Sequence, residues 1–149
     1  MAAPSIHASA VLVGPHAVLI RGPSGAGKSR LALALIEAAA TGALRFARLV
    51  ADDRVHVEAV HGRLLLRPAP TLAGLIEVRG LGIRRLDFEP LAVAGLVADL
   101  GETAANRLPD STSATAMIEG ITLPRLAVAP GQDPLLPVLA CLQAPDAAV

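Results

Sequence analysis

The residues with the clearest chemical role form a glycine-rich run of eight near the N-terminus. The run fits the phosphate-loop pattern G-x-x-x-x-G-K-[ST] without a gap. Glycines let backbone N–H groups approach phosphate oxygens closely, where a Cβ would clash. The lysine of such a run meets the β- and γ-phosphates, and the final hydroxyl ligates Mg²⁺. The run therefore predicts a nucleotide-binding site, and its members are Gly22, Pro23, Ser24, Gly25, Ala26, Gly27, Lys28 and Ser29.

Two adjacent carboxylates, Asp52 and Asp53, follow the short apolar segment 48–51. A site that handles nucleotide phosphates needs carboxylates to hold Mg²⁺ and, in a kinase, often one more to accept the substrate proton. Adjacent strand residues point to opposite faces, so the two should have different roles unless the backbone turns there. An ordinary pair of surface turn aspartates is the alternative, which the phosphate-loop pattern makes less attractive.

Four other polar residues gain a role only by association with these groups. Glu77 precedes a glycine turn and alone would be an exposed glutamate, while Arg79 and Arg107 alone would be solvated or paired with a carboxylate. His7 lies in an apolar segment, which is typical of a hydrogen-bonded core histidine. The remaining histidines share no metal-ligand spacing: His16, His56 and His61.

The pattern around the glycine-rich run predicts a strand before it and a helix after it. Residues 17–20 form the expected buried strand, and residues 29–40 the helix, whose N-terminus favours an anion. Because this helix is apolar almost all round, we expect it to be buried against a sheet. The other expected elements are strands at 6–13, 48–51, 55–60, 63–67, 91–100 and 121–128, a short helix or strand at 72–76, an irregular segment at 104–113 and a short helix over 134–142.

Composition excludes several classes of protein. The 13 Lys and Arg residues balance the 13 Asp and Glu residues, and without a basic stripe nucleic acid is not expected as a partner. The first twenty residues lack the charged start of a signal peptide, and no apolar stretch reaches the roughly 20 residues that span a bilayer. We therefore expect a cytoplasmic protein. Cys141 has no partner for an internal disulfide or a CxxC pair and is expected to pack as a small hydrophobe.

Four features in order resemble the catalytic domain of the HPr kinase/phosphorylase family. They are His7, fifteen positions before the glycine-rich run, the run itself, the segment 49–53, and the segment 77–83 (Glu-Val-Arg-Gly-Leu-Gly-Ile), which is close to that family's signature. The resemblance extends from residue 6 to about residue 131. It implies an α/β fold, a P-loop kinase domain with a mixed sheet, similar to the nucleotide core of phosphoenolpyruvate carboxykinase. We expect one catalytic domain over residues 1–143 and a flexible tail over 144–149.

The resemblance implies an ATP- and Mg²⁺-dependent protein serine kinase that acts on an HPr-type phosphocarrier protein. The same site would also phosphorolyse phosphoserine to pyrophosphate, and the chain would form a homo-oligomer, specifically a hexamer, with no role for a membrane. Two other classes share the glycine-rich run. A P-loop small-molecule kinase normally has an arginine-rich lid, which is not found, and a non-catalytic nucleotide-binding regulator need not keep Asp52, Asp53 and Glu77 together.

The family's functional residues fall on matching positions of this chain. The resemblance implies that Lys28 binds phosphate, that Ser29 and Glu77 hold Mg²⁺, and that Asp53, with Asp52 beside it, accepts the serine proton. His7 would orient or tune that carboxylate, and Arg107 would steady the transferred charge. The signature loop falls on Val78, Arg79, Gly80, Leu81 and Gly82.

The chain departs from the family in two of its loops. An acidic residue commonly follows the serine of the glycine-rich run, where this chain has Arg30. The family's late loop, Pro-Val-Arg-Pro-Gly-Arg, is linked to dephosphorylation, and the matching residues 127–132 read Ala-Val-Ala-Pro-Gly-Gln, with Ala129 and Gln132 in place of both arginines. The family's larger members also carry an N-terminal domain with no counterpart in these residues. We therefore expect kinase activity to be kept and phosphorolysis to be weak.

Overall fold

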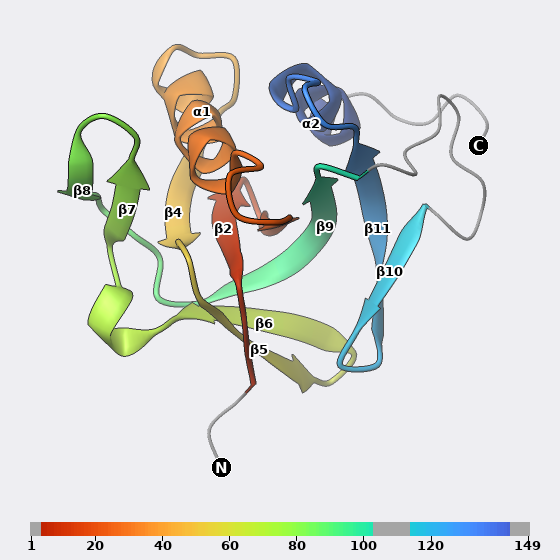
Figure 1. Ribbon diagram of the computed structural model, residues 1–149. Coiled ribbons are helices and arrows are strands. Elements are labelled where there is room, and N and C mark those ends of the chain that lie inside the picture. The colour runs from red at the N-terminus through yellow and green to blue at the C-terminus, as the bar shows by residue number, and fades with distance from the viewer. Residues whose placement is uncertain (1–3, 103–113, 144–149) are drawn as a thin grey trace.

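The computed structural model describes residues 4–102 and 114–143, which form a curled mixed sheet with two helices on one of its faces (Figure 1). The helices are α1 (Lys28–Ala40) and α2 (Leu135–Gln143), and a short 3₁₀ turn, η1, covers Pro70–Leu72. The strands are β1 (Ser5–Ile6), β2 (Ala8–Val13), β3 (His16–Arg21), β4 (Ala47–Ala51), β5 (Val55–Val60), β6 (Arg63–Pro68), β7 (Leu75–Val78), β8 (Gly82–Arg85), β9 (Ala92–Leu100), β10 (Thr115–Ile118) and β11 (Ile121–Val128).

Strand β9 is the centre of the main sheet, whose order is β1-β5-β6-β9-β3-β2-β4. The start of β9 pairs antiparallel with β6, while its second half pairs in parallel with β3 on one side and with β11 on the other. Strand β2 runs antiparallel between β3 and β4. The carboxyl ends of β3, β9 and β11 therefore meet at one edge of the sheet, which is where open α/β sheets bind ligands.

Both faces of the sheet are buried, which explains the near-continuous apolar runs in its central strands. Val18 and Ile20 of β3 pack with α1 and α2, whereas Ala17 and Leu19 point into the second core, which β5 and β6 close. Helix α1 contributes Leu31, Ala32, Leu35 and Ala38 to the first core at the expected spacing. Fully burying one such leucine contributes about 1.5–3 kcal/mol. The packing of α1 on β3 and β2 fixes the position of the loop before it.

Most expected elements are confirmed, and the differences are local. The expected strand 6–13 is interrupted at His7, and the segment 72–76 divides between η1 and β7. The hairpin of β7 and β8 forms a separate two-stranded sheet, and β10 was not expected at all. The expectation for Cys141 is wrong, because its side chain is exposed on α2. The segment 104–113, with Arg107, and the tail 144–149 lie outside the described residues.

None of the helices in the described part of the chain is both long and apolar enough to span a membrane.

Candidate active site

The loop of residues 22–29, here called the glycine loop, connects the end of β3 to the start of α1. Lys28 is the first residue of the helix, and its buried Nζ donates to the carbonyl oxygens of Gly22 at 2.8 Å and Pro23 at 3.1 Å. Gly27 caps the helix with a φ of 98°, a conformation that favours glycine. A Cβ on Gly22 would lie 2.9 Å from the Leu100 oxygen, so the backbone of the loop lies against the end of β9.

Asp52 is buried at the end of β4 and connects three other elements. Its Oδ1 accepts from Ser9 Oγ of β2 at 2.6 Å, and its two oxygens lie 2.7 and 2.9 Å from Ser29 Oγ of the glycine loop. The backbone N–H of Glu77 in β7 also donates to Asp52 Oδ2 at 3.2 Å. The Asp52 carboxylate therefore joins β2, β7 and the glycine loop at one point, next to the hydroxyl that ends the loop.

Asp53 has a different environment from its neighbour, and the backbone turns at this residue. Its φ is 71°, which turns the backbone away from the strand, a conformation that aspartate tolerates better than most residues. Its Oδ1 lies 3.1 Å from His7 Nε2, and both side chains are partly exposed, 64% for the aspartate and 42% for the histidine. Backbone strain of this kind costs about 1–3 kcal/mol and concentrates at functional sites. His7 lies at the interruption between β1 and β2, in a polar contact rather than in the core.

The oxygen groups around the glycine loop suit Mg²⁺, which binds through one or two carboxylates, waters and substrate phosphates rather than a full protein cage. Ser29 and Asp52 supply a hydroxyl and a carboxylate in direct contact. The side chain of Glu77 is exposed, and only its backbone contacts Asp52. Within residues 4–102 and 114–143, no three His, Cys, Asp or Glu side chains lie close enough to form a metal centre by themselves. A magnesium ion here would depend on the phosphates of a nucleotide.

The signature residues form the tight turn of the β7–β8 hairpin. Leu81 donates its N–H to the Val78 carbonyl at 2.9 Å, and Gly80 and Gly82 both adopt positive φ values. The Arg79 side chain is exposed, as is that of Leu81 at 61%. Glu77 of β7 donates its N–H to Asp52, so the hairpin projects from the edge of the candidate site.

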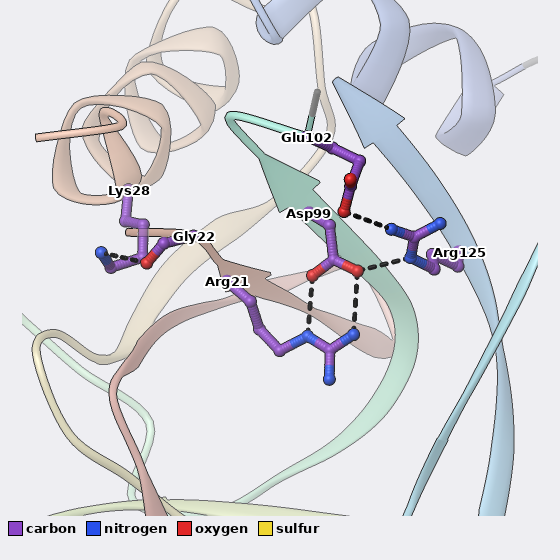
Figure 2. A network of polar contacts seen from close by, with 6 residues as sticks. All are labelled: Arg21, Gly22, Lys28, Asp99, Glu102 and Arg125. Atoms are coloured by element: carbon purple, nitrogen blue, oxygen red, sulfur yellow. Dashed lines mark hydrogen bonds and ion pairs between the residues drawn. The ribbon is translucent and has the colours of Figure 1, made fainter. Parts of the chain in front are cut away.

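A network of two arginines and two carboxylates, on β3, β9 and β11 and just after β9, was missed by the sequence analysis (Figure 2). Arg21 holds Asp99 through two hydrogen bonds of 2.7 and 2.8 Å, and Arg125 Nε donates to the second oxygen of the same carboxylate. Arg125 also donates to Glu102 at 3.1 Å. Arg21 directly precedes Gly22, so the network fixes the strand end from which the glycine loop starts. The available signal was a charged residue in each of these strands, at or next to the end of β3 and β9 and inside β11.

The network changes the pKa values of its members. Burial would raise the pKa of Asp99, but the hydrogen bonds and charges of Arg21 and Arg125 outweigh it and hold that pKa below its usual range. The Asp99 hydrogen bond in turn raises the pKa of Arg21. Because the folded carboxyl has the lower pKa, its contribution to stability is complete above the unfolded value of about 4 and is lost as the pH falls further.

Replacing Asp99 with alanine should lower the free energy of unfolding by about 3 kcal/mol at neutral pH, because two partly buried guanidinium groups each lose their hydrogen bonds to this carboxylate. The difference from the unchanged chain should be constant above about pH 5 and should shrink below about pH 4. Urea unfolding at several pH values measures both. The matched control is Glu58→Ala, which breaks the exposed pair with Arg67 and should cost less than about 1 kcal/mol. Equal losses for the two variants would contradict this prediction.

Residues 1–89 match the family model described as the HPr Serine kinase C-terminal domain, and this stretch contains the glycine loop, both aspartates and the signature hairpin. The chain belongs to this family. A curated HPr kinase/phosphorylase from Streptococcus thermophilus is 44% identical over 96 residues, covering 64% of this chain and 28% of that protein. The HPr kinase/phosphorylase of Limosilactobacillus reuteri is 33% identical over 138 residues, covering 83% of this chain and 40% of that protein.

The same fold is present in a solved structure, the Hpr(Ser) kinase/phosphatase from Coxiella burnetii. It matches with a TM-score of 0.74 at 24% sequence identity, over 94% of this chain and 88% of that one. The curled mixed sheet with helices on one face is therefore the family's architecture. The curated relatives are much longer, since this chain spans about a quarter to two fifths of their length.

Proposed function

We propose that this chain is an ATP-dependent protein serine kinase that acts on an HPr-type phosphocarrier protein. The observation that carries the proposal is the separation of the two adjacent aspartates. Asp52 is bonded to Ser29 of the glycine loop, whereas Asp53 is turned outward beside His7. This separation supports a role for one carboxylate toward the nucleotide and a role for the other toward the serine of a protein substrate. Membership of the HPr kinase family and the relatives' names support the same function.

In this proposal the glycine loop wraps the phosphates of ATP, and Lys28 exchanges its two carbonyl partners for phosphate oxygens. Ser29 and Glu77 would hold Mg²⁺, which would offset charge on the phosphates, and the Asp52 carboxylate lies against Ser29 in the same site. Asp53 accepts the proton as the substrate serine oxygen bonds to the γ-phosphorus and the bond to the leaving ADP breaks. His7 positions Asp53 through its Nε2 contact. Arg107 keeps its proposed role of steadying the transferred charge.

The proposal includes the finer fold assignment, a P-loop kinase domain similar to the nucleotide core of phosphoenolpyruvate carboxykinase. The strand, glycine loop and helix in sequence support it, as does the contact of Ser29 with a carboxylate at the end of a nearby strand. We also propose that residues 1–143 form the catalytic domain and that the protein works in the cytoplasm.

The deciding experiment is to incubate the chain with labelled ATP, Mg²⁺ and the HPr-like carrier and to look for acid-stable phosphoserine. A carrier with its acceptor serine changed to alanine is the control. Label in the unchanged carrier alone supports the proposal. Label in a small metabolite instead would favour a small-molecule kinase, and binding of ATP without any transfer would favour a nucleotide-binding regulator.

Phosphorolysis is expected to be weak compared with the kinase reaction. The reverse reaction must capture inorganic phosphate, which is best held by preorganised guanidinium groups. The structure places Ala129 and Gln132 in a loop facing the glycine loop, and neither supplies a cation. Pyrophosphate release from the serine-phosphorylated carrier, measured over a phosphate titration beside the kinase rate, tests this. Efficient release at low millimolar phosphate would show that the two missing arginines are not needed.

We further propose that the chain forms an oligomer, specifically a hexamer. Large apolar side chains are exposed on several elements, and surface patches of this kind favour association. They include Leu81, Ile83, Leu91 and Leu136. Light scattering over a range of protein concentrations measures the mass, and a monomer at every concentration would contradict the prediction.

A further inference from the structure

A cleft of about 280 Å³ lies beside the glycine loop, on the side away from Asp52. One wall is the glycine loop itself, the floor is the end of β9 at Leu100 and Gly101, and the other wall is the segment after β11, residues 129–134, here called the late loop. The cleft therefore opens at the carboxyl ends of the parallel strands β3 and β9 and continues to the end of β11. Nothing described above gives it an occupant.

We propose that this cleft holds the nucleoside part, the base and ribose, of the nucleotide; the inference rests on the proposed function. A nucleoside triphosphate is a linear ligand with its γ-phosphate at one end. The groups proposed for transfer lie on the β2 and β4 side of the glycine loop, where Asp52 contacts Ser9 and Ser29. The other end of the ligand must then leave the loop on its opposite side, toward β9 and β11.

The size and lining of the cleft suit that part of the ligand. Pockets for whole small molecules measure about 300–1,000 Å³, so 280 Å³ fits a portion whose phosphates lie in the adjoining glycine loop. Among the described residues, none with a charged side chain lines the cleft. A cleft that held phosphate would be expected to have a cationic side chain in its lining. The lining surface as a whole is more polar than apolar, and the side chains in it that can pack on a base and a sugar are Pro23, Ala26, Leu100, Val128, Ala129, Pro130 and Pro134.

The two walls are held at a fixed separation. Arg21 at the end of β3 and Arg125 in β11 both bind Asp99 of β9, which lies between them (Figure 2). The Glu102 N–H, one residue after the floor of the cleft, also donates to the carbonyl of Val128 at 2.9 Å. Val128 directly precedes the late loop, so this bond joins the floor to that wall. Gln132 Oε1 accepts from the Ala129 N–H at 3.3 Å and closes the late loop on itself. A cleft with walls fixed in this way is preformed for its ligand.

The test compares ligands that have and lack the nucleoside. ATP, ADP and inorganic tripolyphosphate are titrated by calorimetry against the unchanged chain and Ala129→Trp, which fills the cleft. We expect Ala129→Trp to weaken the binding of ATP and ADP by about tenfold or more. The binding of tripolyphosphate should weaken by less than about twofold. The control is Met117→Trp on β10, which adds the same side chain at an exposed position. This variant should bind the nucleotides and tripolyphosphate as the unchanged chain does. Circular dichroism shows whether each variant is folded.

A second variant supplies a direct signal from the cleft. The chain has no Trp or Tyr, so Gln132→Trp in the late loop gives a single fluorophore at the cleft. Binding of ADP should change the fluorescence emission of Gln132→Trp, whereas binding of tripolyphosphate should not. The emission of Met117→Trp should change with neither ligand.

Three outcomes would overturn the inference and leave the proposed function standing. The first is that the unchanged chain binds ATP and tripolyphosphate with equal affinity. The second is that folded Ala129→Trp loses affinity for both ligands to the same extent. The third is that the emission of Gln132→Trp does not change when ADP binds. An unchanged chain that binds none of the three ligands would instead refute the proposed function.

Discussion

Replacing Asp53 with asparagine is expected to lower kinase turnover by about 10²- to 10⁴-fold, the range that a general base contributes. The amide keeps the size and polarity of the side chain but cannot accept the serine proton. Because the Asp53 side chain is 64% exposed and pairs with the partly exposed His7, its replacement should not disturb the fold. The measurement is the initial rate of phosphoserine formation at saturating ATP and carrier, together with the affinity for ATP, which should stay within about twofold.

Two comparisons make this result specific. Asp87→Asn changes an exposed aspartate outside the site and should leave the rate unchanged. Asp52→Asn removes a carboxylate bonded to Ser29, so it should weaken Mg²⁺-dependent ATP binding as well as turnover. If Asp53→Asn kept its rate while Asp52→Asn lost turnover without losing affinity, the roles of the two aspartates would be the reverse of those proposed.

Lys28→Ala is expected to weaken ATP binding and to lower turnover by about 10²- to 10³-fold, as when one preorganised donor to a developing charge is removed. Lys28 is buried, yet its amine contacts two backbone carbonyls of the glycine loop rather than the core. The fold should therefore survive, which a thermal melt followed by circular dichroism would show. Calorimetry with ATP measures the affinity.

Arg30→Ala is the matched control for Lys28, because it removes a cation two residues further along α1 whose side chain is exposed. It should leave ATP affinity within about twofold. A Lys28→Ala variant that bound and used ATP as well as the Arg30→Ala variant would show that the glycine loop does not bind the nucleotide phosphates.

The parts of the site that could be predicted are those encoded by neighbouring residues. The glycine loop is one continuous run, and the apolar segments before and after it predicted β3 and α1 closely. The aspartates were found because they directly follow a short buried strand. Strand β11 matches its expected range of 121–128, since turn residues bound this segment on both sides.

The parts that could not be predicted depend on pairs far apart in the sequence. Arg21 and Asp99 are 78 residues apart, and nothing near either one names its partner. The contact of Ser29 with Asp52 is likewise a product of the fold, so the sequence could not show which aspartate contacts the glycine loop. The short strands β7, β8 and β10 have four residues each, too few for a periodic signal.

The position of β3 in the sheet has a consequence for how the chain acquires its site during synthesis. One edge of β3 pairs with β2, which is made just before it, but the other pairs with β9, which ends at residue 100. Bringing such distant segments together is slow because a long loop must close first. A nascent chain that stops short of β9 therefore contains the whole glycine loop but lacks the strand against which Gly22 lies. The loop becomes rigid late, and nucleotide binding should report completed folding rather than assist its first steps.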